Sequence, residues 1–356
     1  MKLALVIERL DPGGGGAERS TCQIATELAR RDHDVTVLAG RAEGDLASLE
    51  PVKVVGSPAG DTRSGGQLRA FVRWAEDQIN QGDYDVSLGM TTMVAADVIQ
   101  PRSGTVIETQ ARNLAMRSSA PARWLKRCLL AVSPKQRVLR QLEHRAISGG
   151  SVRRFASLSE YVTRQLVEHY GVDRDRIDLV PNAAVIPQLS AEEASAARQE
   201  LRARENIGED QMAFLFAAFN PRLKGFEPLM RATSEVISRG HDAVLVLAGR
   251  VGAREQAWIR RAGIESAVRV VGPTDAMARW YRAADVTVLP TFYDPASKVV
   301  IESLLAGTPA ITTRYNGAAD WVMPEGGPVR GRVIDDPADV TALADAMAEL
   351  CGNEAR

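Results

Sequence analysis

The chain has 356 residues, a length that suggests two domains or one large barrel. Hydrophobic residues make up 45% and charged residues 25%, which is ordinary for a globular protein and excludes a disordered, collagen-like or disulfide-stapled chain. The 44 basic and 45 acidic residues leave a net charge of −1, which argues against a protein that is basic overall, as many nucleic-acid binders are.

Cysteine content and hydropathy bear on the compartment. The three cysteines, at positions 22, 128 and 351, are too widely spaced for a disulfide framework or a zinc site. The apolar run Leu3–Ile7 is too short for a signal peptide, and no stretch reaches the ~20 apolar residues that cross a bilayer. We expect a cytoplasmic protein, with a peripheral position on the inner face of the plasma membrane left open.

The first forty residues alternate between strand and helix. Short apolar runs at Leu3–Ile7 and Val35–Leu38 predict strands, and residues 17–32 between them place apolar side chains on one helical face. Strand, loop, helix and strand in this order predict a βαβ unit and a parallel sheet.

The same alternation returns in the second half of the chain. It predicts strands at 214–218, 243–248, 268–271, 286–289 and 309–313, and helices at 226–239, 253–263, 275–284 and 298–306. We therefore expect an α/β protein of two Rossmann-like, doubly wound parallel-sheet domains. The proline-containing segment 181–188 suggests domains at 1–183 and 184–356. Such neighbouring domains usually bind a ligand at the carboxyl ends of their strands.

Four consecutive glycines, residues 13–16, follow the first strand and open a helix. Backbone N–H groups at a helix N-terminus suit an anion. A dinucleotide fingerprint is not supported, because its sixth position is Glu18 or Arg19 instead of glycine. A flexible turn is the plain alternative. We favour close approach of this backbone to a ligand, because repeated glycine weakens a turn without a gain in packing.

Two acidic residues stand eight positions apart after the strand at 286–289. Asp294 is expected in the loop, Ser297 at the N-cap of the next helix, and Glu302 one turn into it. Carboxylates accept hydrogen bonds from sugar hydroxyls, and the free N–H groups after Ser297, with Lys298, suit a phosphate. The pattern indicates a nucleotide-sugar site. The alternative is that Asp294 caps a turn and Glu302 is solvated.

The segment 291–309 resembles the E-x7-E motif of retaining glycosyltransferases of the GT-B fold, family 4, with Asp294 and Glu302 in the acidic positions. Other motifs resemble that family in chain order: residues 14–19 (GGGAER), 180–182 (VPN), 224–225 (KG) and 306–309 (AGTP). The basic stretch 112–145 resembles the membrane-interacting region of lipopolysaccharide core glucosyltransferases.

The resemblance implies roles for individual residues. Glu302 would hold the ribose hydroxyls of the nucleotide, and Asp294 would contact the transferred sugar. Lys224 and Arg222 would neutralise the diphosphate. The remaining substrate-binding positions implied are Gly15, Gly16, Thr109, Gln110, Val271, Gly272, Ser297, Lys298 and Val299; Thr109 and Gln110 are expected in the loop where many members carry a histidine.

The implied reaction is retention of the anomeric configuration, with the leaving diphosphate accepting the proton of the acceptor. Catalysis then consists mainly of positioning and charge stabilisation. The resemblance favours UDP-glucose as donor and a lipid-linked or cell-envelope glycan as acceptor, with no metal and no cofactor besides the donor. Asp173-Arg174-Asp175 matches the D-x-D metal motif of another fold, and we interpret it as a structural turn.

Residues 112–145 contain nine Arg or Lys and one acid, Glu143, a local charge of +8. An ordinary helix with a solvated charged face is one interpretation. The sharper one is an anchor on an anionic membrane surface, aided by Trp124. A nucleic-acid site is disfavoured because only one aromatic residue is interleaved.

Two other functions remain open at this point. A nucleotide-sugar 2-epimerase of GT-B fold would need acid–base groups, which four histidines hardly supply. A non-catalytic nucleotide-sugar-binding subunit would fit the departures at Asp294 and Ser297, where the family usually has Glu and Gly. The family also continues past residues 337–351 with a helix that crosses back to the first domain, and we expect this chain to lack it.

Overall fold

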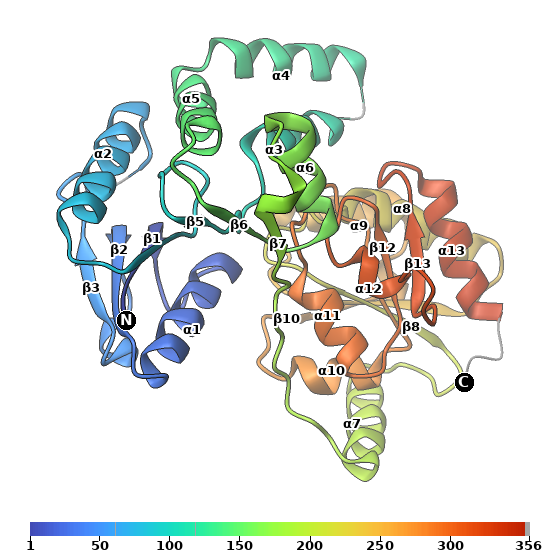
Figure 1. The fold of residues 1–356 in the computed structure, drawn as a ribbon. Coiled ribbons are helices and arrows are strands. Elements are labelled where there is room, and N and C mark those ends of the chain that lie inside the picture. The colour runs from blue at the N-terminus through green and yellow to red at the C-terminus, as the bar shows by residue number, and fades with distance from the viewer. Residues whose placement is uncertain (61, 118, 353–356) are drawn as a thin grey trace. The chain divides into compact units, whose positions relative to one another are not determined.

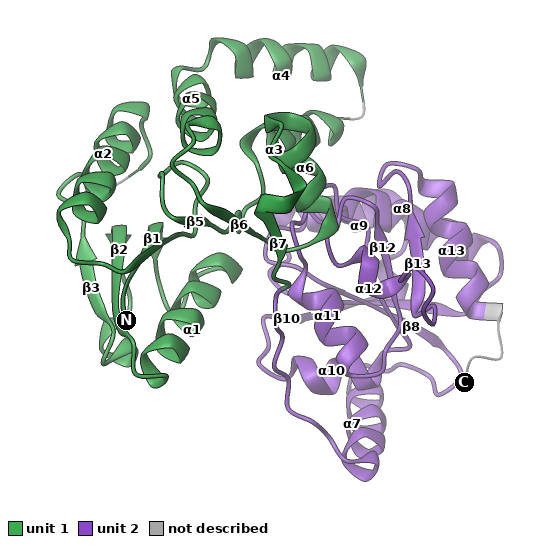
Figure 2. Cartoon of the chain, in the orientation of Figure 1, with its two compact units in different colours: residues 1–181 green, residues 182–356 purple. Residues whose placement is uncertain are grey.

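The computed structural model describes residues 1–60, 62–117 and 119–352 (Figure 1). The chain divides between Pro181 and Asn182 into two compact units, coloured separately in Figure 2. Unit 1 is residues 1–181 and unit 2 is residues 182–356. Each is an α/β domain with its own parallel sheet, and each is described by itself.

Unit 1 is built on a seven-stranded sheet in the order β3-β2-β1-β4-β5-β6-β7, with every neighbouring pair parallel. Its strands are β1 (Lys2–Leu10), β2 (Asp34–Ala42), β3 (Lys53–Gly56), β4 (Val86–Gly89), β5 (Val98–Ile99), β6 (Arg154–Ser157) and β7 (Ile177–Leu179). Its helices are α1 (Gly16–Arg30), α2 (Gly65–Gln81), α3 (Val106–Ala115), α4 (Ala120–Val132), α5 (Pro134–Ser148) and α6 (Glu160–Tyr170).

Unit 2 repeats the plan with six parallel strands in the order β10-β9-β8-β11-β12-β13. Its strands are β8 (Met212–Ala217), β9 (Ala243–Ala248), β10 (Val268–Gly272), β11 (Val286–Leu289), β12 (Ala310–Thr313) and β13 (Gly331–Ile334). Its helices are α7 (Ala191–Arg204), α8 (Phe226–Ser238), α9 (Ala253–Ala262), α10 (Met277–Ala283), α11 (Lys298–Leu305), α12 (Ala319–Val322) and α13 (Val340–Gly352).

The sequence of β8 explains why it lies in the centre of its sheet. All six of its residues are buried, and alternate side chains point to opposite faces. Phe214 and Phe216 pack with α8 and α13 on one face, while Leu215 and Ala217 pack with α7 and α10 on the other. A continuous apolar run is what a parallel strand needs when helices cover both faces.

The strand order places a switch point in each sheet. The chain proceeds outward on one side from β1 and then returns to begin again at β4, and it does the same at β8 and β11. Loops that follow strands on either side of such a point diverge and leave room for a ligand at the carboxyl edge. The glycine loop follows β1, and the loop with Asp294 follows β11.

The predicted fold class is confirmed, and the predicted elements of the second half are present with boundaries within about three residues. Two local expectations are wrong. The basic stretch is not one helix: it spans the end of α3, all of α4 and most of α5. Thr109 and Gln110 do not stand in a loop, because α3 begins at Val106, where Thr105 caps it by accepting a hydrogen bond from the amide of Glu108.

Among the residues that the structure describes, no helix combines the length and the apolar composition that crossing a bilayer requires.

Candidate functional site

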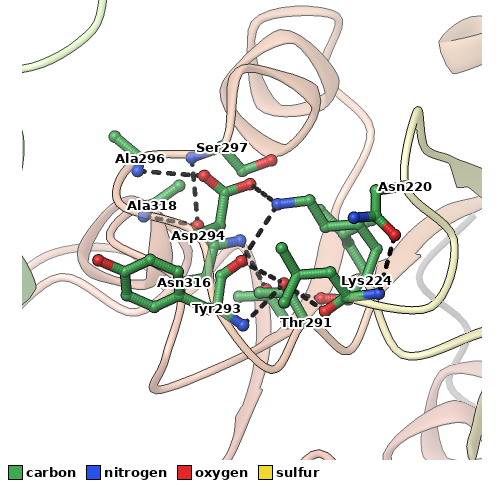
Figure 3. Close-up of polar contacts among 12 residues, drawn as sticks. Asn220, Lys224, Thr291, Tyr293, Asp294, Ala296, Ser297, Asn316 and Ala318 are labelled. Atoms are coloured by element: carbon green, nitrogen blue, oxygen red, sulfur yellow. Dashed lines mark hydrogen bonds and ion pairs between the residues drawn. The ribbon is translucent and has the colours of Figure 1, made fainter. Parts of the chain in front are cut away.

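The central feature of the site in unit 2 is an ion pair between the loops after β8 and β11. The ammonium of Lys224 lies 2.5 Å from Oδ2 of Asp294 and also donates to the carbonyl of Tyr293 at 3.3 Å (Figure 3). Both side chains are mostly buried, at 19% and 14% exposure. The pair therefore lies at the switch point of this sheet, with little water to screen it.

Gly225 explains how the two loops come so close. Its φ is +80°, and a Cβ atom built there would lie 2.0 Å from the carbonyl oxygen of Pro290. No other residue type can both adopt this conformation and allow the contact. In the Lys224-Gly225 motif, the glycine thus allows the close approach of the two loops, and the lysine forms the ion pair between them.

The loop that carries Asp294 is fixed by its backbone and its own carboxylate. The Asp294 amide donates to Tyr315 O at 2.9 Å, and its carbonyl accepts from Gly317 N at 2.8 Å. Oδ1 of Asp294 accepts from the amide of Ala296 at 3.2 Å. The carboxylate therefore caps a turn, as the alternative interpretation of the sequence expected, and it also pairs with Lys224.

Asn316 holds the same loop from the end of β12. Its side-chain oxygen accepts from the amides of Ser297 (3.2 Å) and Ala318 (3.0 Å), and its side-chain nitrogen donates to Thr312 (2.8 Å). The residue is 1% exposed and uses both ends of its amide. A satisfied buried network of this kind gives the loop one defined conformation.

Ser297 occupies the N-cap position of α11, as expected, but its hydroxyl makes no capping hydrogen bond. The expectation of a side-chain cap is wrong, because Asn316 supplies the oxygen at this helix start and takes the Ser297 amide. The first-turn amides that follow, from Lys298 and Val299 onward, have no intrahelical acceptor by geometry. Gly307 ends the helix with φ +79°, as predicted.

Glu302 lies one turn into α11 and faces α10. Its Oε2 accepts a hydrogen bond from the hydroxyl of Tyr281 at 2.8 Å. Burial raises the pKa of Glu302, and the Tyr281 hydroxyl and the Lys298 charge act in the opposite direction. The alternative of a solvated helix residue is therefore wrong, and the carboxylate is a positioned, partly buried acceptor.

The remaining candidates of unit 2 lie at the same carboxyl edge. Arg222 is in the turn after β8, where its carbonyl accepts from Gly225 N at 3.3 Å. Val271 and Gly272 end β10, and the Gly272 carbonyl accepts from Gly249 N at 2.8 Å. Parallel strands end on one edge, so these loops and the start of α11 share it. Their roles stay predictions.

The glycine loop of unit 1 shows no conformational need for glycine at its last two positions. Neither Gly15 nor Gly16 has a positive φ, and a Cβ at Gly16 would meet nothing within 4 Å. Asp11 organises the start of the loop by accepting from Gly13 N at 3.0 Å. The packing of this unit thus leaves the backbone at Gly16 open, as close approach to a ligand would require.

Thr109 and Gln110 line a cavity of unit 1 on α3. Gln110 donates to the side-chain oxygen of Gln136 on α5 at 2.8 Å. The expected loop is wrong, because both residues lie in a helix. The expectation that they contact substrate stays a prediction, since both line the wall of a cavity.

Sequence reasoning missed three residues that build the site in unit 2. Tyr281 and Asn316 hold Glu302 and the Asp294 loop as described above. Asn182 donates to the carbonyl of Ala296 at 2.8 Å. Asn182 belongs to a motif that the sequence analysis noted without a role, whereas Tyr281 and Asn316 carry no signal in a single sequence.

Within the described ranges, no group of three or more His, Cys, Asp or Glu side chains is arranged to hold a metal ion. Asp173 of the D-x-D match caps a short turn before β7 by accepting from the amide of Asp175 at 3.2 Å.

Two protein-family models match the chain. Residues 14–185 match the family model described as Glycosyltransferase Family 4, and residues 211–353 match the model described as Glycosyl transferases group 1. Together the two models cover most of the chain.

Three similar proteins extend the comparison. The chain is 22% identical to "Lipopolysaccharide glucosyltransferase WaaG" of Escherichia coli (strain K12), over 94% of this chain and 85% of that protein. A crystal structure of WaaG superimposes with a TM-score of 0.77, 21% identity and coverage of 99% of this chain and 90% of that one. HepE of Anabaena, solved in complex with UDP and glucose, superimposes with a TM-score of 0.62, 17% identity and coverage of 99% and 93%.

A "D-inositol 3-phosphate glycosyltransferase" of Pseudarthrobacter chlorophenolicus is 32% identical over 49% of this chain and 42% of its own length. The chain spans about half the length of this relative and of similar ones that bear the same name.

Proposed function

We propose that this chain, which belongs to the glycosyltransferases of GT-B fold with a family 4 domain followed by a group 1 domain, transfers a hexose from a UDP-sugar to a glycan acceptor. UDP-glucose is the favoured donor, and a lipid-linked or cell-envelope glycan is the favoured acceptor. The observation that carries the proposal is the buried Lys224–Asp294 pair at the carboxyl edge of the unit 2 sheet.

The chemistry of this pair suits a donor that carries both a diphosphate and a sugar. A diphosphate is a stronger partner for Lys224 than a single carboxylate, because it offers more negative charge and more acceptor oxygens. Once Lys224 turns to the diphosphate, the Asp294 carboxylate can accept hydrogen bonds from sugar hydroxyls. Arg222, Lys298 and the first-turn amides of α11 add further stabilisation of negative charge.

Glu302 suits the ribose of the same donor. Its carboxylate is fixed by Tyr281 through one oxygen, and the other oxygen can accept from vicinal hydroxyls. Val271 and Gly272 would contact the base, and Gly15 and Gly16 the diphosphate or the acceptor. This assignment of roles follows the family resemblance; Val271 and Gly272 lie at the end of β10, and Glu302 lies in α11.

Retention of configuration is what the family resemblance implies, and we include it in the proposal. If the leaving diphosphate accepts the proton of the attacking hydroxyl on the same face of the sugar, the protein needs no general base there. It supplies position and charge stabilisation, so that the leaving group departs readily. Neither a metal ion nor a cofactor besides the donor is part of this proposal.

Helix α4 supports a location on an anionic membrane surface. None of its residues is buried, and Trp124, Leu125, Leu129 and Val132 are 54–67% exposed. Figure 1 shows α4 at the margin of unit 1, next to α5. Exposed apolar residues with neighbouring cations are the features of a helix that lies in the membrane interface. The membrane contact would bring the enzyme to a lipid-linked acceptor on the cytoplasmic side.

A nucleotide-sugar screen tests the donor proposal. Unfolding temperature is measured with UDP-glucose, UDP-galactose, GDP-mannose and the free nucleotides, because a ligand that binds the folded state raises it by mass action. We expect stabilisation by UDP and more by one UDP-hexose. Stabilisation by GDP-sugars alone would contradict the donor. Interconversion of the sugar without an acceptor would indicate an epimerase, and binding without turnover a non-catalytic subunit.

A further inference from the structure

Asn316 is a buried side chain of unit 2 for which the proposed reaction has no direct use. It is 1% exposed and offers a donor almost no surface, whereas the Asp294 side chain is 14% exposed. The two residues are nonetheless joined, because they pair as an isolated parallel bridge between the loops that follow β12 and β11 (Figure 3). Any effect of Asn316 on the reaction must therefore pass through the loop that carries Asp294.

The hydrogen bonds around Asn316 fix which way its amide points. The Thr312 hydroxyl donates to the carbonyl of Leu289 at 2.9 Å, which uses its one hydrogen. Thr312 must then accept from the side-chain nitrogen of Asn316, 2.8 Å away, and this turns the side-chain oxygen toward the amides of Ser297 and Ala318. Only a group with a donor on one side and an acceptor on the other satisfies these partners together.

The Ser297 amide links this network to the carboxylate of Asp294. Ser297 directly follows Ala296, whose amide donates to Oδ1 of Asp294 at 3.2 Å and so sets the rotation of the carboxyl group. With Oδ1 held there, Oδ2 faces the ammonium of Lys224 at 2.5 Å. Asn316 holds the Ser297 end of this turn, and the main-chain hydrogen bonds of Asp294 hold the other end.

The same hydrogen bond removes one group from the expected anion contacts at the start of α11. The Ser297 amide is taken by Asn316, and Ser297 itself is 3% exposed. An amide that is buried and paired in this way is not offered to a phosphate. Ser297 thus transmits the position of Asn316 to the loop instead of binding a phosphate through its amide.

We propose that Asn316 is a positioning residue for the Asp294 carboxylate, which it keeps oriented toward Lys224 in the free protein and toward sugar hydroxyls in the donor complex. This role rests on the proposed function and deepens it, because it names a residue that acts on the sugar contact without touching the donor. Loss of the side-chain oxygen of Asn316 would release the Ser297 amide and let the carboxyl group rotate. A misaligned group then supports the reaction much less than an aligned one.

Lysine-ammonium NMR tests this positioning without any reaction. Lysines occur only at positions 2, 53, 126, 135, 224 and 298, so the ammonium signals of the full chain are few, and Lys224→Gln assigns the one of interest. We expect Asn316→Leu, which is similar in shape but has no acceptor, to move this signal toward its position in Asp294→Asn. Asn316→Asp keeps an acceptor oxygen for the Ser297 amide and should keep the signal close to that of the wild type.

Rates of transfer test the same positioning in the reaction. Asn316→Leu should lower kcat at least about tenfold at a temperature where it is folded, the scale of losing a hydrogen bond from a charged group. Its affinity for UDP, which carries no hexose, should stay close to that of the wild type. In the Asp294→Ala background, Asn316→Leu should lower the rate little further, because a residue that acts through Asp294 has nothing left to position.

Arg202→Met is the control for a purely structural loss. Arg202 is 4% exposed and binds Asp285 and the Gly208 carbonyl, which precede β11 and β8 at the edge of the sheet opposite the site. This variant should lower the unfolding temperature and leave both the Lys224 signal and the kcat of the folded protein unchanged. A wild-type Lys224 signal in Asn316→Leu, or an equal loss of kcat in Arg202→Met, would overturn the positioning role.

The two readouts separate the positioning role from the proposed function. If the wild-type chain binds no UDP-sugar and transfers no hexose, the proposed function fails, and the NMR comparison still decides whether Asn316 orients Asp294. If transfer occurs and Asn316→Leu retains both the rate and the Lys224 signal, only the positioning role fails.

Discussion

Replacement of Lys224 is expected to change both stability and activity, because Lys224 has two roles. It neutralises the largely buried carboxylate of Asp294 in the free protein, and it is placed to neutralise a diphosphate when donor binds. Removing it leaves a buried charge without a partner, which costs stability in addition to activity. Any variant of Lys224 must therefore separate these two effects.

Lys224→Ala should lower transfer by about 100-fold, the scale of losing one preorganised charge partner. It should also lower the unfolding temperature. The double variant Lys224→Ala with Asp294→Asn removes the uncompensated charge, so it should recover stability and not activity. Steady-state rates and unfolding temperatures of the wild type, the single variant and the double variant separate the effect on activity from the effect on stability. Full activity in Lys224→Ala, at a temperature where it is folded, would remove Lys224 from the site.

Glu302 predicts a pH dependence of donor binding. Burial raises its pKa, so it takes up a proton at a higher pH than an ordinary glutamate when the pH falls. The carboxylate is the acceptor for ribose hydroxyls, and the protonated form has less acceptor capacity. The affinity for UDP should therefore decrease as the pH falls through this raised pKa and be constant above it.

Titration calorimetry with UDP between pH 8 and pH 5 measures this dependence. In Glu302→Gln, affinity should be lower by about tenfold and nearly independent of pH, because the loss of a hydrogen bond from a charged group amounts to roughly 1.5 kcal/mol. An unchanged pH profile in Glu302→Gln would show that another group, such as the phosphate of the nucleotide, causes the effect.

At the scale of elements, α4 differs from the other long helices because none of its residues is buried. Exposed leucines at 56% and 54% accessibility contribute little to the fold, so their replacement isolates their role at a surface. Leu125→Ser with Leu129→Ser should leave the unfolding temperature nearly unchanged. It should reduce adsorption to anionic vesicles at least about tenfold, because each leucine contributes up to about 1.5–3 kcal/mol when buried in lipid.

Co-sedimentation with phosphatidylglycerol and with phosphatidylcholine vesicles measures the adsorption. Val185→Ser serves as the matched control, since it removes an apolar side chain that is 92% exposed and belongs to unit 2 instead of α4. Equal adsorption to neutral and anionic vesicles would exclude the electrostatic part of the anchor. Equal loss in the control would exclude α4.

Helix α5 is held by the one acid of the basic stretch. Glu143 is completely buried, and it accepts hydrogen bonds from Thr92 at 2.5 Å, from the Val106 amide at 2.8 Å and from the hydroxyl of Tyr170. It thereby joins α5 to the start of α3 and to α6. The sequence presented Glu143 as a minor member of a charged face, whereas the structure makes it the polar centre of this part of unit 1.

Glu143→Ala should lower the free energy of unfolding by roughly 3 kcal/mol, because it leaves several buried donors unpaired. Arg140→Ala on the exposed side of the same helix is the control and should change it by less than about 0.5 kcal/mol. Urea unfolding followed by circular dichroism measures both. A loss in Glu143→Ala no larger than the control's would mean that water replaces the carboxylate at little cost.

For the whole molecule, the periodicity of the sequence predicted the two parallel sheets because buried β8 and β9 are continuous apolar runs between helices. Asp294 and Glu302 were predicted as one site from their spacing and Lys224 was added by the family resemblance; the structure brings Lys224 and Asp294 into contact. Tyr281 and Asn316 could not be predicted, because their partners lie 21 and 19 residues away and only folding brings them together. Thr109 was placed in a loop because the family resemblance implies a loop there, although the residues of α3 are amphipathic at helical spacing.

The central claim is that the chain moves a hexose from a UDP-sugar by means of the site around Lys224 and Asp294. It is tested most directly by incubating the full chain with radiolabelled UDP-glucose and vesicles that contain a lipid-linked cell-envelope glycan, and by measuring label in the lipid and UDP released. The account predicts equal amounts of both products in the wild type and about 100-fold less in Lys224→Ala. UDP release or labelling that is unaffected by Lys224→Ala, or no transfer from any UDP-hexose, would contradict it.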